Sequence, residues 1–359
     1  MSTLLFGYGV IFVYYWEKQA ESELLESWLP LSNLDLFVPH LYPSCFFVYE
    51  KPILEFRSML STLKKGLSKL LIPYHPLAGE VVTSPAGEPE IHCNNHGVEF
   101  IEAYADIELC NLALHHPDAY LAGKLLPMRP TAVLVSDGYS AMASLQAIDS
   151  SNGSKKTKFE AFSGCLWKAV AKSVSGGEAC KLGVLVDGRL TLIDDVRSKD
   201  AMAIYYGNVV SLPYSELDAN ELTTKPLSWP ADQVHDFLRS IVTPGHFQGF
   251  VDWIEAQRPH MILPTSLYKG TMGGPSFAIP YGRLFHSNKL DFGWGRPILG
   301  SCYFPRCMDS GYVMPMPSPA TNGDWVVYMH LCKHQLDIAA AELRDVLHPL
   351  NFALLKLHE

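Results

Sequence analysis

The chain has 359 residues, and 48% of them are hydrophobic, enough to fill the core of one large domain or two ordinary ones. Its formal net charge is −9 at pH 7 and its pI is about 5.9, so the composition indicates no basic face for nucleic acid. The sequence contains no internal repeats and no low-complexity tracts.

The cysteines are scattered along the chain, and no two of them form a Cys-x-x-Cys pair. The eight residues are Cys45, Cys93, Cys110, Cys165, Cys180, Cys302, Cys307 and Cys332. This pattern predicts reduced thiols in a cytoplasmic protein rather than a framework of disulfides.

The N-terminal run from Leu4 to Trp16 is apolar but shorter than the roughly 20 residues that a membrane-spanning helix needs. No basic residue precedes it, which argues against a signal peptide. Its aromatic and β-branched residues favour a buried strand, with a helix or a membrane anchor as the alternatives. We therefore expect no membrane partner.

Three elements are predicted next along the chain. Residues 17–28 are polar and predict a short helix, and residues 45–49 predict a buried strand. Residues 54–71 place apolar side chains at helical spacing, which predicts an amphipathic helix.

Residues 90–93 and 98–101 are predicted to be the two strands of a hairpin, with Gly97 supplying the turn. Three side chains in this region could be taken for metal ligands: His92, Cys93 and His96. An extended strand and a turn need not bring these side chains together, so we expect structural roles for them and no bound metal. The following stretch, residues 106–127, predicts loop and short helix, with residues 115–118 on the surface.

The second half of the chain begins with a polar stretch, residues 150–156, which is the best candidate for a linker. An apolar stripe predicts a helix over residues 159–174, and residues 182–187 predict a strand that ends in a turn. Ser228 is a candidate N-cap of a further helix. Residues 325–328 predict a strand near the C-terminus, and residues 334–346 predict the last helix.

The stretch Asp291-Phe292-Gly293-Trp294-Gly295 places two large aromatic residues among glycines, with an acidic residue before them. Glycine adopts positive φ angles freely, so this spacing predicts a tight turn that fixes the directions of the two aromatic side chains. On physical grounds alone it is a buried loop anchored by aromatics. Asp291 is expected to make local hydrogen bonds or an ion pair, with Arg296 and Arg283 as candidate partners.

As a string, the same stretch resembles the signature of the plant BAHD acyltransferases, which transfer an acyl group from coenzyme A to an alcohol or amine. Other segments share the resemblance: Leu29-Pro30-Leu31-Ser32-Asn33-Leu34-Asp35, Tyr74-His75-Pro76-Leu77-Ala78-Gly79-Glu80, Tyr205-Tyr206-Gly207-Asn208 and Gly311-Tyr312-Val313-Met314-Pro315. The likeness covers roughly residues 27–130 and 155–359. It implies an α/β fold of two similar lobes of chloramphenicol-acetyltransferase-like type, with mixed sheets flanked by helices.

The resemblance divides the chain into an N-terminal lobe at residues 1–150, shortened around residues 128–145, and a C-terminal lobe at residues 151–359. The C-terminal lobe carries the Asp-Phe-Gly-Trp-Gly loop. In the family this loop is structural, so Asp291, Gly293, Trp294 and Gly295 are expected to support the fold rather than the chemistry.

The family's catalytic box, His-x-x-x-Asp-Gly, is incomplete in this chain. Asp137-Gly138 matches its second half, but Val133 stands where the histidine belongs, and none of the 14 histidines has an aspartate four residues later. The resemblance implies that Asp137 holds the loop by pairing with an arginine, which matches Arg189. On the residues alone, Asp137 is equally well an ordinary turn residue.

Two functions follow from these observations. The first is acyl transfer from acyl-CoA, with a hydroxycinnamoyl donor preferred, to a small alcohol or amine, by a cytoplasmic monomer without a permanently bound cofactor. The second is a catalytically silent relative, or a truncated product, that acts at most as a binding protein. A serine hydrolase is not indicated, because Gly138-Tyr139-Ser140-Ala141-Met142 lacks the second glycine of a nucleophile elbow. Which residues contact coenzyme A is left open.

Overall fold

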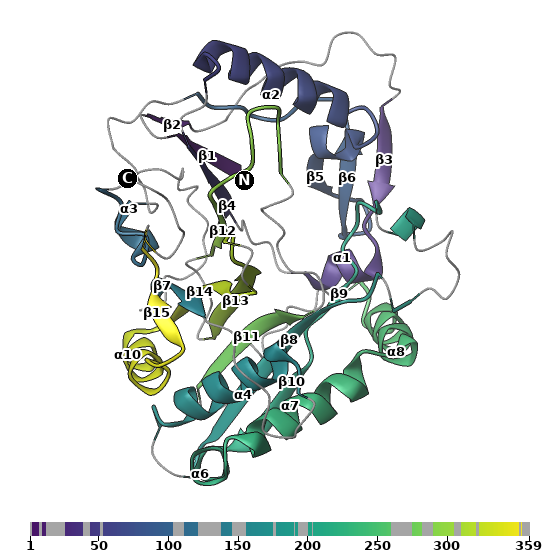
Figure 1. Ribbon diagram of the computed structural model, residues 1–359. Helices are drawn as coiled ribbons and strands as arrows, with labels where there is room; N and C mark the ends of the chain where they lie inside the picture. Colours follow the sequence, from purple (N-terminus) through teal and green to yellow (C-terminus); the bar gives the residue numbers. More distant parts are fainter. Residues whose placement is uncertain are drawn as a thin grey trace.

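The computed structural model describes most of the chain. The described residues are 2–6, 9–11, 26–38, 44–50, 53–102, 111–120, 138–145, 156–174, 177–189, 191–192, 200–202, 204–259, 275–281, 290–304, 310–320, 323–351 and 353. They form a mixed α/β structure in which sheets are flanked by helices, as predicted (Figure 1).

The largest sheet has eight strands and is built mostly from the second half of the chain. Its main path follows the order β10-β8-β11-β13-β14-β7-β15, and β9 pairs with β8. The strands span β7 (Gly138–Leu145), β8 (Ala179–Asp187), β9 (Val210–Ser211), β10 (Tyr214–Asp218), β11 (Ser276–Tyr281), β13 (Gly311–Pro317), β14 (Trp325–Cys332) and β15 (Leu347–Pro349).

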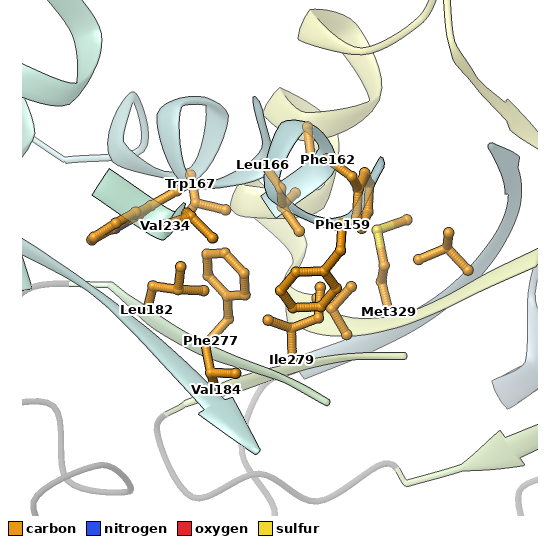
Figure 2. Packing of buried hydrophobic residues seen from close by; sticks show 14 of the residues in the cluster. Phe159, Phe162, Leu166, Trp167, Leu182, Val184, Val234, Phe277, Ile279 and Met329 are labelled. Atoms are coloured by element: carbon orange, nitrogen blue, oxygen red, sulfur yellow. The ribbon is translucent and has the colours of Figure 1, made fainter. Parts of the chain in front are cut away.

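One face of this sheet is covered by helices that bury the main hydrophobic core (Figure 2). Phe162, Leu166 and Trp167 of the central helix are fully buried against strand residues such as Phe277 and Val184. Burial of this much apolar surface is the dominant stabilising term for a fold of this kind. The helices that pack here are α4 (Lys158–Ala171), α6 (Ala219–Thr224), α7 (Ser228–Ile241) and α10 (Lys333–Glu342).

The second sheet, with the order β12-β4-β1-β2, joins the N-terminal strands to a strand from late in the chain. Its members are β1 (Ser2–Phe6), β2 (Gly9–Ile11), β4 (Ser44–Tyr49) and β12 (Leu299–Tyr303). The amphipathic helix α2 (Phe56–Leu70) packs against it through Met59 and Leu60. Where the structure describes it, the apolar N-terminal run therefore forms two paired strands, β1 and β2, and residues 7–8 and 12–16 lie outside that part. No helix among the described residues is long and apolar enough to cross a membrane.

A third, three-stranded sheet has the order β3-β6-β5 and is accompanied by short helices. The elements are β3 (Ser27–Pro30), α1 (Asn33–Phe37), the 3-10 helix η1 (His75–Ala78), β5 (Glu80–Thr83), β6 (Pro89–Cys93) and α8 (Pro244–Glu255). The short helix α3 (Pro117–Tyr120) lies apart from this sheet and packs against β7 (Figure 1).

This small sheet corrects two of our predictions. Residues 27–28 belong to β3, not to a helix, because their backbone pairs with β6, and Trp28 stacks on His92 with ring centroids 4.0 Å apart. Residues 98–101 form no strand, because both edges of β6 are already occupied by β3 and β5. The remainder of the predicted helix at residues 17–28 lies mostly outside the described residues.

The helix that we expected Ser228 to cap begins at Ser228 itself. Leu227 occupies the N-cap position, and no side chain makes the capping hydrogen bond there. By contrast, Thr157 caps α4 in a reciprocal capping box with Glu160, a signal that stands in the sequence at the end of the linker candidate.

Strand pairing crosses the division that we predict at residue 150. β7 precedes that boundary but pairs with β14 and β15, whereas β12 follows it but pairs with β4. A second core fills the space between the two larger sheets, with β4 and β12 contributing from one side and β7, β13 and β14 from the other. The division into residues 1–150 and 151–359 stays a prediction, and each part supplies a strand to the sheet of the other.

Candidate functional site

Two of the segments that carry the sequence motifs, residues 29–35 and 205–208, meet at a polar junction beside α1. Asp35 accepts hydrogen bonds through Oδ1 from the backbone N–H and the side-chain amide of Asn208, at 2.7 and 2.9 Å. Its Oδ2 accepts from the Ser32 hydroxyl, within the capping box that starts the helix. These bonds connect residues 29–35 to Tyr205-Tyr206-Gly207-Asn208, which lies about 170 residues later in the sequence.

Arg189 joins the same junction from the end of β8. Its Nη2 donates to the carbonyl oxygen of Gly207 at 2.8 Å, and its Nη1 lies 3.2 Å from Oδ1 of Asp187. Both side chains of this ion pair are mostly buried, so solvent screens the pair less than a surface pair. Asp137 lies outside the described residues, so its predicted pairing with Arg189 stays a prediction.

Another arginine links the two halves of the chain nearby. Arg258 donates to both carboxylate oxygens of Glu88 and to Oδ1 of Asn33. The guanidinium lowers the pKa of the Glu88 carboxyl, chiefly through their hydrogen bonds. Bidentate arginine–carboxylate contacts of this type fix orientation, so this pair holds the turn before β6 against the end of α8. The hydrogen bond to Asn33 adds α1 to the same contact.

The Asp291–Gly295 loop lies elsewhere, against β4 and α2. Oδ1 of Asp291 accepts from the backbone N–H groups of Gly293 and Gly295 at 2.8 and 3.2 Å, which confirms the predicted local hydrogen bonds. Both glycines have φ near +100°, a conformation that other residues adopt only with strain. Trp294 packs edge-on against Tyr49, with ring centroids 6.3 Å apart. Phe292 is 36% exposed, so the loop is anchored by aromatics but lies at the surface rather than in the core.

A buried polar cluster lies where the two larger sheets face each other. The Ser140 hydroxyl on β7 is 2.9 Å from Nδ1 of His330 and 3.1 Å from the Tyr328 hydroxyl, both on β14. His330 is 2% exposed and Tyr328 is fully buried. Buried polar groups are normally hydrogen-bonded, yet Nε2 of His330 has no hydrogen-bond partner among the described residues.

Asp118 connects this cluster to the neighbouring elements. Its Oδ2 accepts from the Ser140 N–H at 2.7 Å, and its Oδ1 accepts from the Tyr303 hydroxyl at 2.8 Å. Burial lowers the pKa of His330, and the nearby Asp118 carboxylate opposes that shift. Burial and the hydrogen bond to Asp118 both raise the pKa of Tyr303, which therefore stays a neutral donor. Ser140 thus links His330 to Tyr328, Asp118 links Ser140 to Tyr303, and burial favours the neutral form of the imidazole.

Comparison with known proteins identifies the chain. Residues 19–137 and 138–344 match the Transferase family, which comprises the BAHD acyltransferases. The chain belongs to this family. It is thus an acyl-CoA-dependent transferase by descent, and acyl-CoA is the family's co-substrate.

Two curated relatives align with most of this BAHD protein. It is 26% identical to the omega-hydroxypalmitate O-feruloyl transferase of Arabidopsis thaliana over 391 residues, which cover 78% of this chain and 81% of the relative. It is 21% identical to the shikimate O-hydroxycinnamoyltransferase of Nicotiana tabacum over 425 residues, which cover 88% and 94%. Both alignments are longer than the 359 residues of this chain, so each relative contains residues without a counterpart here.

The fold of this BAHD protein is similar to that of solved relatives. The crystal structure of vinorine synthase superimposes with a TM-score of 0.65 at 17% identity, covering 94% of this chain and 97% of the other. The predicted architecture of two chloramphenicol-acetyltransferase-like lobes is confirmed by this likeness.

Sequence reasoning located some polar residues of the BAHD scaffold and missed others. Arg189 and Asp291 were found from motifs, and the structure gives each of them backbone partners. His330 and Ser140 were not singled out as a pair, because 190 positions separate them. The available signal was a histidine in the apolar strand from residue 325, on the same face of that strand as Tyr328.

His92 and His96, expected to be structural, contact Glu26 and Glu80, and no metal-binding group occurs among the described residues.

Proposed function

We propose that this protein transfers a hydroxycinnamoyl group from coenzyme A to a small alcohol or amine. The observation that carries the proposal is the family match over residues 19–344, together with relatives whose names specify feruloyl and hydroxycinnamoyl transfer. We infer that it works as a cytoplasmic monomer without a permanently bound cofactor. The scattered cysteines, none of them in a Cys-x-x-Cys pair, support a cytoplasmic location.

The reaction requires the acceptor to lose a proton while it attacks the thioester carbonyl. The tetrahedral oxyanion must then be stabilised until the thiolate of coenzyme A leaves. Family resemblance assigns the proton transfer to the histidine of the His-x-x-x-Asp box, and Val133 occupies that position here. A positioned base contributes about 100- to 10,000-fold to the rate, so its absence slows turnover without removing the binding of acyl-CoA.

The second candidate function is a silent relative that binds acyl-CoA but does not turn it over. Two observations favour it, namely the valine at position 133 and the break in the family match between Asp137 and Gly138. The break coincides with the region where we predict the N-terminal lobe to be shortened. Asp137 is therefore the remnant of a catalytic box in this candidate, and it keeps only a structural role.

A thioester assay separates the two candidates. The purified protein is incubated with p-coumaroyl-CoA and a panel of alcohols and amines, and free thiol is measured as coenzyme A is released. Isothermal titration with p-coumaroyl-CoA measures binding in parallel. Acceptor-dependent thiol release supports the transferase, whereas binding without release supports the silent relative. Absence of both contradicts both candidates.

Restoring the missing imidazole tests how much of the machinery remains. Val133→His is expected to raise thiol release by about 100-fold or more if only the base is lacking. Val135→His, which adds an imidazole two residues away along the chain, is the matched control and is expected to give no gain. An unchanged rate in Val133→His would mean that more than the base has been lost from this region.

A further inference from the structure

The central strands of the large sheet present a row of polar side chains toward the second sheet. Alternation along β14 places Val327 and Met329 in the core under the helices, and Val326 and Tyr328 in the core between the sheets. His330 therefore lies on the face between the sheets. Its cross-strand neighbours are Tyr312 on β13 and Ser140 on β7.

This row lies close in register to the remnant of the catalytic box. β7 begins at Gly138, directly after Asp137, and Gly138 is paired with Cys332 two residues beyond His330. The His330 imidazole therefore lies near the start of β7, which directly follows the remnant of the catalytic box. The family resemblance assigns the proton-transfer step to that box.

The hydrogen bonds determine which nitrogen of His330 carries the proton. The backbone N–H of Phe304 donates to the Tyr328 oxygen, so that oxygen already serves as an acceptor. If the Tyr328 hydroxyl donates to Ser140, and Ser140 donates to Nδ1 of His330, every hydroxyl proton has an acceptor. In the reverse order, the Tyr328 proton has no acceptor among the described residues. The first arrangement leaves the imidazole proton on Nε2.

The Nε2–H group is consequently a buried donor that has no acceptor in the part of the chain that the structure describes. Such a group destabilises the fold until an oxygen is placed against it, because it has lost its hydrogen bond to water. Burial also favours the neutral ring over the imidazolium. A neutral imidazole that donates from a fixed position is suited to polarise a carbonyl group, and it keeps its proton during the reaction.

We propose that Nε2–H of His330 donates a hydrogen bond to the carbonyl oxygen of the acyl thioester, an assignment that rests on the acyl transfer proposed above. The acceptor's oxygen or nitrogen forms a bond to the carbonyl carbon, and the π electrons move to the carbonyl oxygen, where the His330 donor stabilises them. When the carbonyl re-forms, the carbon–sulfur bond breaks. The thiolate takes up a proton in place of the one that the acceptor lost. Because His330 is 2% exposed, acyl-CoA must displace the groups that cover the ring.

Infrared spectroscopy of the bound thioester tests this contact without turnover. The probe is p-coumaroyl-CoA labelled with carbon-13 at the carbonyl, and a hydrogen bond lowers its stretching frequency. We expect a lowered frequency on the wild-type protein, loss of that shift in His330→Ala, and partial retention in His330→Gln, whose amide is also a donor. His246→Gln is the matched control, because Nε2 of His246 is 2.8 Å from the Ser211 hydroxyl in a separate serine–histidine pair. That variant should keep the wild-type shift.

Turnover gives the second readout. If the wild-type protein releases thiol, His330→Ala should lower that rate by about 100- to 1,000-fold, with a smaller loss in His330→Gln. Equal frequencies in the wild type and His330→Ala would overturn the assignment while leaving the transferase function intact. Equal losses in both variants, with a rate that falls as His330 becomes protonated, would identify a base instead of a donor and also overturn it. Failure of the wild-type protein to bind the thioester would defeat both proposals.

Discussion

The Asp291–Gly295 loop and the Ser140–His330 cluster differ in almost every physical respect. The loop lies at the surface, its acidic residue bonds to backbone N–H groups two and four residues away, and its glycines occupy positive φ. The cluster is buried, and its members come from positions 190 residues apart. Asp291 makes two hydrogen bonds within the loop, whereas the Nε2 atom of His330 in the cluster has no hydrogen-bond partner among the described residues.

The comparison shows that the residues by which a family is identified need not be the residues that are suited to chemistry. A tight turn with glycines at positive φ allows few substitutions, so it leaves a distinct string in the sequence. A hydroxyl and an imidazole that meet across two strands produce no recognisable sequence motif, because their separation in the sequence depends on how the strands pair. An unpaired buried donor is nevertheless the more informative feature for function, since structures rarely retain one without a reason.

Among the variants that compare the cluster with the loop, removal of the Ser140 hydroxyl should lower the free energy of unfolding the most. Ser140→Ala leaves Nδ1 of His330 and the Tyr328 hydroxyl without their shared partner, and we expect a loss of about 1–3 kcal/mol in the free energy of unfolding. Urea denaturation measures it. Ser276→Ala is the matched control, because that serine is similarly buried but its hydroxyl has no hydrogen-bond partner within the described ranges. Equal effects in the two variants would show that the cluster contributes no net hydrogen-bond energy.

Asp291→Ala tests the loop and should have a smaller effect. The two backbone N–H groups that the carboxylate accepts from lie at the surface and can turn to water, so we expect a loss of about 1 kcal/mol. Thermal melting measures stability, and thiol release per folded molecule measures activity, which should stay at the wild-type level. A variant that melts normally but loses turnover would reverse the roles that we assign to the two regions.

The pH dependence of stability should show the smallest effect. The folded pKa of His330 is lowered, so the unfolded chain binds a proton at a higher pH than the folded protein does. Stability should therefore decrease as pH falls below about 6.5 toward the lowered folded pKa, and then level off. Among the described residues, the Asp118 carboxylate opposes this lowering of the pKa, and Tyr312 is the cross-strand neighbour of His330. Melting curves between pH 7.5 and 5 should be flatter for His330→Gln, and an unchanged slope would assign the effect to other histidines, such as His246.

Much of the fold followed from patterns within single elements. Apolar side chains at helical spacing predicted α2 and α4, because that period places them on a common face of the helix. The continuous apolar run at residues 45–49 predicted β4, which is buried on both of its faces. The prediction of a strand at residues 98–101 was wrong because other strands, β3 and β5, pair with β6 instead. That segment has the composition of a strand, but both edges of β6 are already paired, and local propensity carries no information about free edges.

By itself, the sequence determined the family, the mixed α/β class and the residues that shape the Asp291–Gly295 turn, since each depends on neighbours only a few positions away. Only the tertiary structure decided which sheet each strand joins, that Asp35 binds Asn208, and that Ser140 meets His330. The physical reason is that these contacts depend on strand order and register. Those are settled by burying apolar surface over the whole molecule, not by any local segment.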